Sequence, residues 1–78
     1  MFQPQSPEEI ERLVKSIAKR LAQNKGLEPE QFYDKLQPLI DEAVEWQTQN
    51  PTKSAYGNFR VDLKAKYLMQ ELLREALQ

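Results

Sequence analysis

Three stretches of the chain place apolar residues three or four positions apart, at the spacing of an α-helix. The first begins after Ser6 and Pro7, residues typical of a helix N-terminus because the serine hydroxyl can cap the first turn. Glu9 completes a capping box, and Gly26 can take the left-handed conformation that ends a helix. The apolar stripe between them consists of Ile10, Leu13, Val14, Ile17, Ala18 and Leu21. This pattern predicts a helix over about 7–25.

The second stretch restarts after Pro29 and predicts a helix over about 29–49. Its stripe consists of Phe32, Leu36, Leu39, Ile40, Ala43, Val44 and Gln47. Pro38 interrupts it, since a proline inside a helix removes one backbone hydrogen bond and costs roughly 3 kcal/mol. We expect one helix kinked near Pro38, with two helices, about 29–36 and 38–49, as the alternative. Trp46 lies at the edge of the stripe, where its ring can cover a seam between helices.

The last stretch carries apolar residues on two sides and predicts a helix over about 58–77. A broad stripe consists of Val61, Ala65, Leu68, Met69, Leu72, Leu73, Ala76 and Leu77, and a narrow line consists of Phe59, Leu63 and Tyr67. Gly57 or Asn58 is the expected cap. Residues 58–64 also alternate between apolar and polar side chains, as in a strand. Because no second segment offers a strand partner, we favour a helix, with a strand paired to its copy in a homodimer as the alternative.

Three long helices joined by short connections predict an all-α fold, a small antiparallel three-helix bundle. The 78 residues are expected to form a single domain, 1–78, with 1–5 disordered. A chain of this length has a thin core. It contains neither cysteine nor histidine, so neither a disulfide nor a structural zinc site reinforces it.

The charges are distributed unevenly along the chain. Residues 6–25 and 51–78 each carry a net charge of +2, and residues 26–50 carry −5, so the whole chain carries −1. One interpretation is that these charges complement each other inside the bundle and set its topology. The other is that an acidic face of the second helix receives a basic partner.

No stretch of the sequence has the features of a membrane or secretory segment. No apolar run approaches the ~18 residues that a membrane span requires. The first residues lack the basic and apolar blocks of a signal peptide. We therefore expect a cytoplasmic protein that does not bind membranes.

The residue types argue against catalysis. Histidine, the commonest general base, and cysteine, the strongest nucleophile, are absent. The two glycines, Gly26 and Gly57, form no phosphate-binding loop. Asp34, Asp41 and Glu45 lie on neighbouring turns, but without loop carbonyls or a cavity they do not predict a metal site. We expect no enzymatic activity, no cofactor, no metal and no small-molecule substrate.

Nucleic-acid binding is the alternative function. Residues 17–36 weakly resemble a helix-turn-helix, but the helix after the turn offers mainly acidic side chains to the phosphates, so an ordinary helical turn is favoured. The first helix carries Arg12, Lys15, Lys19 and Arg20 away from its apolar stripe. A small nucleic-acid-associated regulator would use this basic face, although nearby glutamates dilute it.

The sequence points first to protein interaction. The loop before the last helix carries tyrosine and arginine, which are favoured anchors at protein interfaces. We predict a non-enzymatic interaction module or small accessory subunit that binds another protein or its own copy through the last helix and this loop. The expected partner-binding residues are Tyr56, Phe59, Arg60, Leu63 and Tyr67. The alternative is that these side chains pack within the monomer, with Tyr56 and Phe59 closing one end of the bundle.

Overall fold

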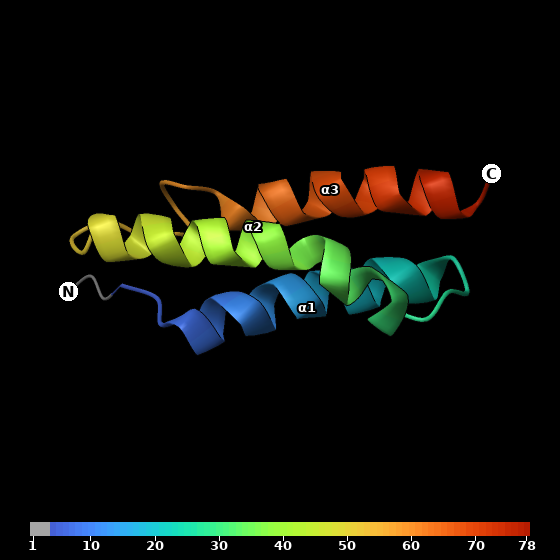
Figure 1. The fold of residues 1–78 in the computed structure, drawn as a ribbon, viewed down its shortest axis with the longest axis horizontal. Helices are drawn as coiled ribbons and strands as arrows, with labels where there is room; N and C mark the ends of the chain where they lie inside the picture. The colour runs from blue at the N-terminus through green and yellow to red at the C-terminus, as the bar shows by residue number, and fades with distance from the viewer. Residues whose placement is uncertain (1–3) are drawn as a thin grey trace.

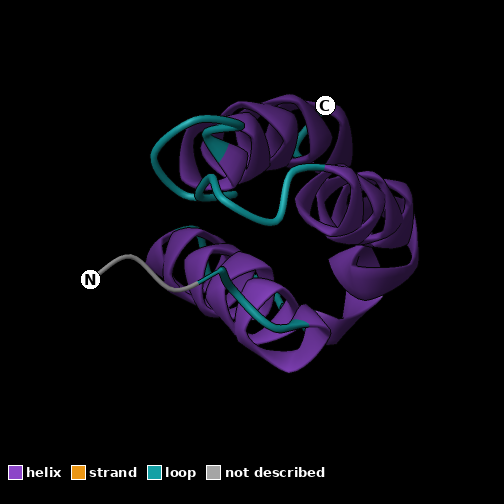
Figure 2. Cartoon of the chain, turned by 90° about the vertical axis from the view of Figure 1, so that its left-hand side faces the viewer, coloured by secondary structure: helices purple, strands orange, loops and turns teal. Residues whose placement is uncertain are grey.

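The computed structural model describes residues 4–78 as three helices joined by loops. Helix α1 spans Pro7–Asn24, α2 spans Glu30–Gln49 and α3 spans Val61–Ala76. α1 and α3 run in the same direction and α2 runs in the opposite one (Figure 1). Seen from one end, the three helices stand at the corners of a triangle (Figure 2). The predicted all-α three-helix bundle is confirmed.

The apolar stripes of the three helices meet in one core along the long axis of the bundle, which measures 42 × 19 × 17 Å. Its largest fully buried side chains are Ile10, Val14, Leu36, Val61 and Met69. Fully buried alanines on all three helices (Ala18, Ala22, Ala43 and Ala65) complete it. Such small side chains allow neighbouring helices to approach closely, because the distance between helix axes depends on the side chains at the contact.

α1 begins and ends as its local sequence predicts. The Ser6 hydroxyl accepts a hydrogen bond from the Glu9 backbone N–H at 3.1 Å, and the Ser6 N–H donates to the Glu9 carboxylate at 3.2 Å. At the other end Gly26 has φ +71°, and the Leu27 N–H donates to the Ala22 carbonyl at 2.9 Å. This is the left-handed glycine cap of a Schellman motif.

α2 is one continuous helix with Pro38 inside it, so the two-helix alternative is wrong. Its ribbon changes direction in the green first half, where Pro38 lies in the sequence (Figure 1). The kink is the expected result of the backbone hydrogen bond that proline cannot donate.

The predicted start of the last helix at residue 58 is wrong, and so is the strand alternative. Residues 58–60 belong to the loop, and α3 begins at Val61. Asn58 does not cap the helix, because it lies two residues before the N-cap position and its side-chain oxygen accepts a hydrogen bond from the Ser54 N–H at 3.1 Å. Arg60 takes the N-cap position in the left-handed conformation, with φ +62° and no side-chain cap.

We expect Arg60→Gly to be more stable than Arg60→Ala by about 1 kcal/mol. A residue with a Cβ atom is strained by roughly 1–2 kcal/mol in the left-handed region, and glycine is not. The greater conformational entropy of glycine in the unfolded chain offsets part of this stabilisation. Both variants remove the ion pair between Arg60 and Asp62, so their difference isolates the backbone effect. Urea unfolding of the two variants measures it, and equal midpoints would contradict the strain.

The prediction of disorder for residues 1–5 is only partly covered, because residues 1–3 lie outside the described residues. Gln5, which this prediction also covers, is hydrogen-bonded to two other segments of the chain. The Gln5 N–H donates to the Gln47 side-chain oxygen at 3.2 Å, and the Gln5 side-chain oxygen accepts from the Ser54 hydroxyl at 2.9 Å. Within residues 4–78, no helix combines the length and the hydrophobicity needed to cross a membrane.

Candidate functional site

Tyr56, the first of the predicted partner-binding residues, contacts α1. Its hydroxyl donates a hydrogen bond to the Glu9 carbonyl oxygen at 3.2 Å, and its half-buried ring packs against the core. Burial raises the pKa of the Tyr56 phenol, and the nearby Glu9 carboxylate raises it further, while Arg12 opposes the shift. The neutral phenol therefore remains available as a hydrogen-bond donor that ties the loop to α1.

Phe59 contacts α2 instead. Its ring centroid lies 5.5 Å from that of Trp46 in a tilted arrangement, and the Lys64 ammonium lies 3.6 Å from the centre of the Phe59 ring. Arg60 is exposed, with its guanidinium Nε 3.5 Å from the Asp62 carboxylate. Tyr56 and Phe59 thus anchor the loop to two different helices, which is the arrangement expected if they close the end of the bundle.

Leu63 and Tyr67 lie on the outer face of α3, without Phe59. Because α3 begins only at Val61, Phe59 is not one helical turn before Leu63, and the predicted Phe59–Leu63–Tyr67 line is broken. The line continues toward the C-terminus instead, at spacings of four, three, four and three residues. We call this set the outer stripe; it consists of Leu63, Tyr67, Gln70, Arg74 and Leu77.

The outer stripe carries unusual exposed hydrophobic surface. Tyr67 is 60% exposed and Leu77 is 53% exposed, and they are the two large hydrophobic residues that lie exposed in the described part of the chain. At 100° per residue, the stripe lies roughly opposite the buried face formed by Val61, Ala65 and Met69. α3 therefore presents one apolar side to the core and a second, mixed side outward.

A groove adjoins the C-terminal half of the outer stripe, between the ends of α1 and α3. It has a volume of about 470 Å³. We call it the C-terminal groove. It is lined by Leu21, Asn24, Lys25, Gln70, Leu73, Arg74 and Leu77. Leucines supply its apolar part, and Lys25 and Arg74 are its charged residues. Sequence reasoning missed this groove because it requires two helix ends that are far apart in the chain.

Gln47, the polar member of the second stripe, is buried and forms hydrogen bonds that the sequence pattern did not reveal. Its side chain is 6% exposed and uses its full hydrogen-bonding capacity. The oxygen accepts from the backbone N–H groups of Gln5 at 3.2 Å and Ala55 at 2.9 Å. The amide nitrogen donates to the carbonyls of Asn50 at 3.0 Å and Lys53 at 2.6 Å. One amide thus holds the N-terminal segment and the loop between α2 and α3 against the end of α2.

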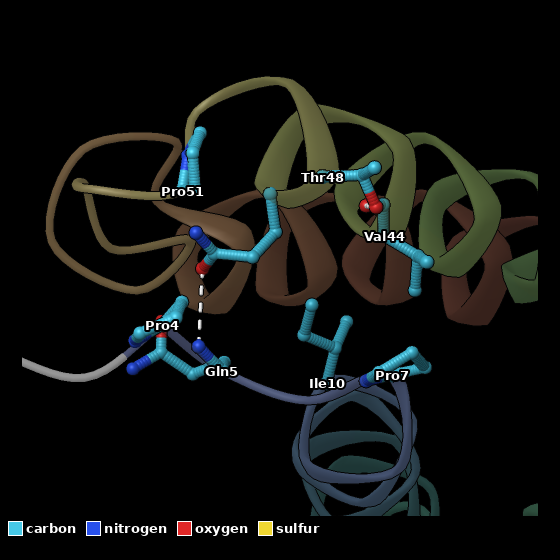
Figure 3. Close-up of a pocket in the computed structure, with 8 residues that line it drawn as sticks. Pro4, Gln5, Pro7, Ile10, Val44, Thr48 and Pro51 are labelled. Atoms are coloured by element: carbon cyan, nitrogen blue, oxygen red, sulfur yellow. Dashed lines mark hydrogen bonds between the residues drawn. The ribbon is translucent and has the colours of Figure 1, made fainter.

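A smaller cavity of about 240 Å³ lies beside Gln47 (Figure 3). Figure 3 shows Pro4, Gln5, Pro7 and Ile10 on one side of it, and Val44, Thr48 and Pro51 on the other. Its volume falls below the roughly 300–1,000 Å³ of small-molecule sites. The Gln47 amide on its wall has no capacity left for a ligand, so we assign this cavity a structural role.

The charges of the three helices do not pair with one another. The three ion pairs among residues 4–78 join Lys15 to Glu11, Arg60 to Asp62 and Arg74 to Glu71, each between near neighbours in sequence. Direct ion pairs between helices, among residues 4–78, therefore do not supply the charge complementarity predicted inside the bundle. The acidic residues Glu30, Asp34, Asp41 and Glu45 are exposed along the outer side of α2. Nowhere in residues 4–78 do three acidic side chains gather as they would to hold a metal ion.

The basic face of α1, on which the nucleic-acid alternative depends, is interrupted. Arg12, Lys19 and Arg20 are exposed. Lys15 is half-exposed, with its ammonium 3.7 Å from the Glu11 carboxylate and 5.1 Å from the centre of the Tyr33 ring. The internal ion pair reduces the charge that this face could offer to phosphates.

Comparison with protein-family models, with curated proteins and with solved structures found no match for this chain.

Proposed function

We propose that this protein is a non-enzymatic protein-interaction module that binds its partner through the outer face of α3. The observation that carries the proposal is the exposure of Tyr67 on α3 and of Leu77, the residue that caps the C-terminus of the same helix. Exposed apolar surface on a small protein commonly marks a contact site, and tyrosine and arginine are among the residues that contribute most to binding. Of the residues expected from the sequence, Leu63 and Tyr67 belong to this surface, and Gln70, Arg74 and Leu77 extend it.

The spacing of the outer stripe favours a helical partner. Alternating steps of four and three residues form the narrow seam along which two helices pack side by side. Gln70 and Arg74 lie between the apolar residues and would fix the alignment of the partner, since a polar position within a seam specifies register at some loss of affinity. The C-terminal groove gives the partner a concave surface next to the stripe.

Site-specific photo-crosslinking tests the proposal. A photoreactive phenylalanine analogue replaces Tyr67 in one protein and, as a control, the exposed Gln31 of α2 in another. Both proteins are irradiated in an extract of cells that produce the protein. We expect position 67 to give a discrete cross-linked product that weakens when Leu77→Ser is added, and position 31 to give none. The same products from both positions, or none from position 67, would contradict the proposal.

A further inference from the structure

We infer that the partner of the outer stripe is a second copy of this chain, bound as an antiparallel two-fold dimer through α3. The inference rests on the proposed function, and it adds the identity of the partner and the alignment of the two helices. Its basis is that an exposed aromatic ring, Tyr67 on α3, and an exposed leucine, Leu77 at the C-cap of α3, are separated by ten residues, and that Leu77 lines the C-terminal groove. A two-fold interface requires a self-complementary surface: the first residue of such a pair contacts the second residue of the partner copy, and the second contacts the first.

The alignment follows from helix geometry. Tyr67 and Leu77 lie five residues on either side of Leu72, so they are about 15 Å apart along the helix axis. A two-fold axis level with Leu72 and perpendicular to α3 brings Tyr67 of each copy against Leu77 of the other. The contact between Tyr67 and Leu77 then forms twice in the dimer, once at the edge of each C-terminal groove.

The polar residues between them agree with the same alignment. Gln70 and Arg74 lie two residues on either side of Leu72, so each Gln70 faces Arg74 of the second copy. Glu71, whose carboxylate lies 2.9 Å from the Arg74 guanidinium within one chain, lies one residue before Leu72 and about 80° around the helix from the centre of the stripe. The Glu71 carboxylate therefore balances the Arg74 charge at the rim of the interface, and the side-chain oxygen of Gln70 can accept a hydrogen bond from the guanidinium of the second copy.

The groove residues suit an aromatic ring from the second copy. Lys25 makes no ion pair among the described residues, and with Arg74 it leaves the charged lining of the C-terminal groove entirely basic. A tyrosine ring attracts such cations through its π face without bringing a buried charge of its own. An acidic partner would have to bury a carboxylate near the carbonyl ends of α1 and α3, where the helix dipoles oppose negative charge.

The dimer is expected to be weak. One helix pair with two ring–leucine contacts lies at the low end of specific interfaces, below about 1,200 Å² of total buried area. We expect a Kd of about 10–300 µM, which requires protein concentrations up to about 1 mM for its detection. Because the two-fold axis repeats each contact, Tyr67→Ser removes the ring twice and should raise the Kd at least tenfold.

Sedimentation equilibrium from about 5 µM to 1 mM measures the dimer directly. We expect wild type and the control Gln31→Ser to dimerise alike, and Tyr67→Ser and Leu77→Ser to remain monomeric over most of this range. Circular dichroism should show unchanged helicity, since both stripe residues are more than half exposed. A wild-type chain that stays monomeric at 1 mM overturns the inference.

Cysteine crosslinking tests the alignment, because the natural chain has no cysteine. A mixture of Tyr67→Cys and Leu77→Cys proteins, treated with a short bis-maleimide, should give far more crosslinked dimer than either protein alone. Equal yields from the mixture and from Tyr67→Cys alone overturn the alignment. If photo-crosslinking from position 67 captures a different protein while the wild type stays monomeric, the dimer is wrong and the proposed function stands. If it captures nothing and the wild type stays monomeric at 1 mM, both are wrong.

Discussion

Gln47→Leu is expected to destabilise the protein by about 2–3 kcal/mol. Leucine keeps nearly the same volume at the end of α2 but removes four hydrogen bonds. The Ala55 N–H would then stay buried without an acceptor, which alone costs roughly 1–3 kcal/mol. In a domain of this size each kcal/mol lowers the Tm by about 4–8 °C. Thermal and urea unfolding followed by circular dichroism would measure the loss.

Gln49→Leu is the matched control for this substitution. Gln49 is exposed on the same last turns of α2, and among residues 4–78 its side chain bonds only to the Glu45 carboxylate, at 3.3 Å. We expect its stability to stay within about 0.5 kcal/mol of wild type, as for most surface changes. Hydrogen exchange of the Ala55 amide should accelerate in Gln47→Leu and not in Gln49→Leu. Equal stability of the two variants would mean that the Gln47 amide does not hold the loop.

Leu36→Ala should destabilise the protein by about 3–5 kcal/mol. Leu36 has no exposed surface and lies in the core between the three helices, so its truncation loses buried apolar area and leaves a cavity. Small domains have few kcal/mol of stability to lose, so we expect a substantial unfolded fraction at 37 °C. The unfolding free energy should be measured at a few µM protein, where self-association does not add to it.

Leu77→Ala provides the comparison, because it makes the same chemical change on the outer stripe. Leu77 is 53% exposed, and alanine is at least as favourable at a helix end. We expect a loss below about 0.5 kcal/mol for the monomer. A loss at Leu77 as large as that at Leu36 would show that the outer stripe is part of the folding core and not a surface for a partner.

Local sequence signals were enough where a few neighbouring residues decide the conformation. The start of α1 depends on Ser6 and Glu9, three residues apart, and its end on Gly26. The kink of α2 follows from Pro38, whatever the helix packs against. The apolar spacing of all three helices in turn predicted an all-α bundle, because each stripe must be buried against another.

The start of α3 could not be read from spacing alone. Residues 58–60 fit a helix and a strand equally well as a pattern, and neither forms. Asn58 instead bonds back to Ser54, and the Val61 N–H donates to the Ala55 carbonyl at 3.1 Å. These bonds exist because Gln47 and Trp46 on α2 hold the loop from the other side.

The sequence by itself determined the three helices, their order and the residues of the core, since these follow from caps and from helical periodicity. Only the tertiary structure decided which of the two apolar sides of α3 faces outward, because that depends on where α1 and α2 lie around it. It also gave the Gln47 side chain four hydrogen-bond partners outside α2, which are the backbone groups of Gln5, Asn50, Lys53 and Ala55. The same arrangement placed Tyr56 and Phe59 against the bundle and left Tyr67 and Leu77 exposed.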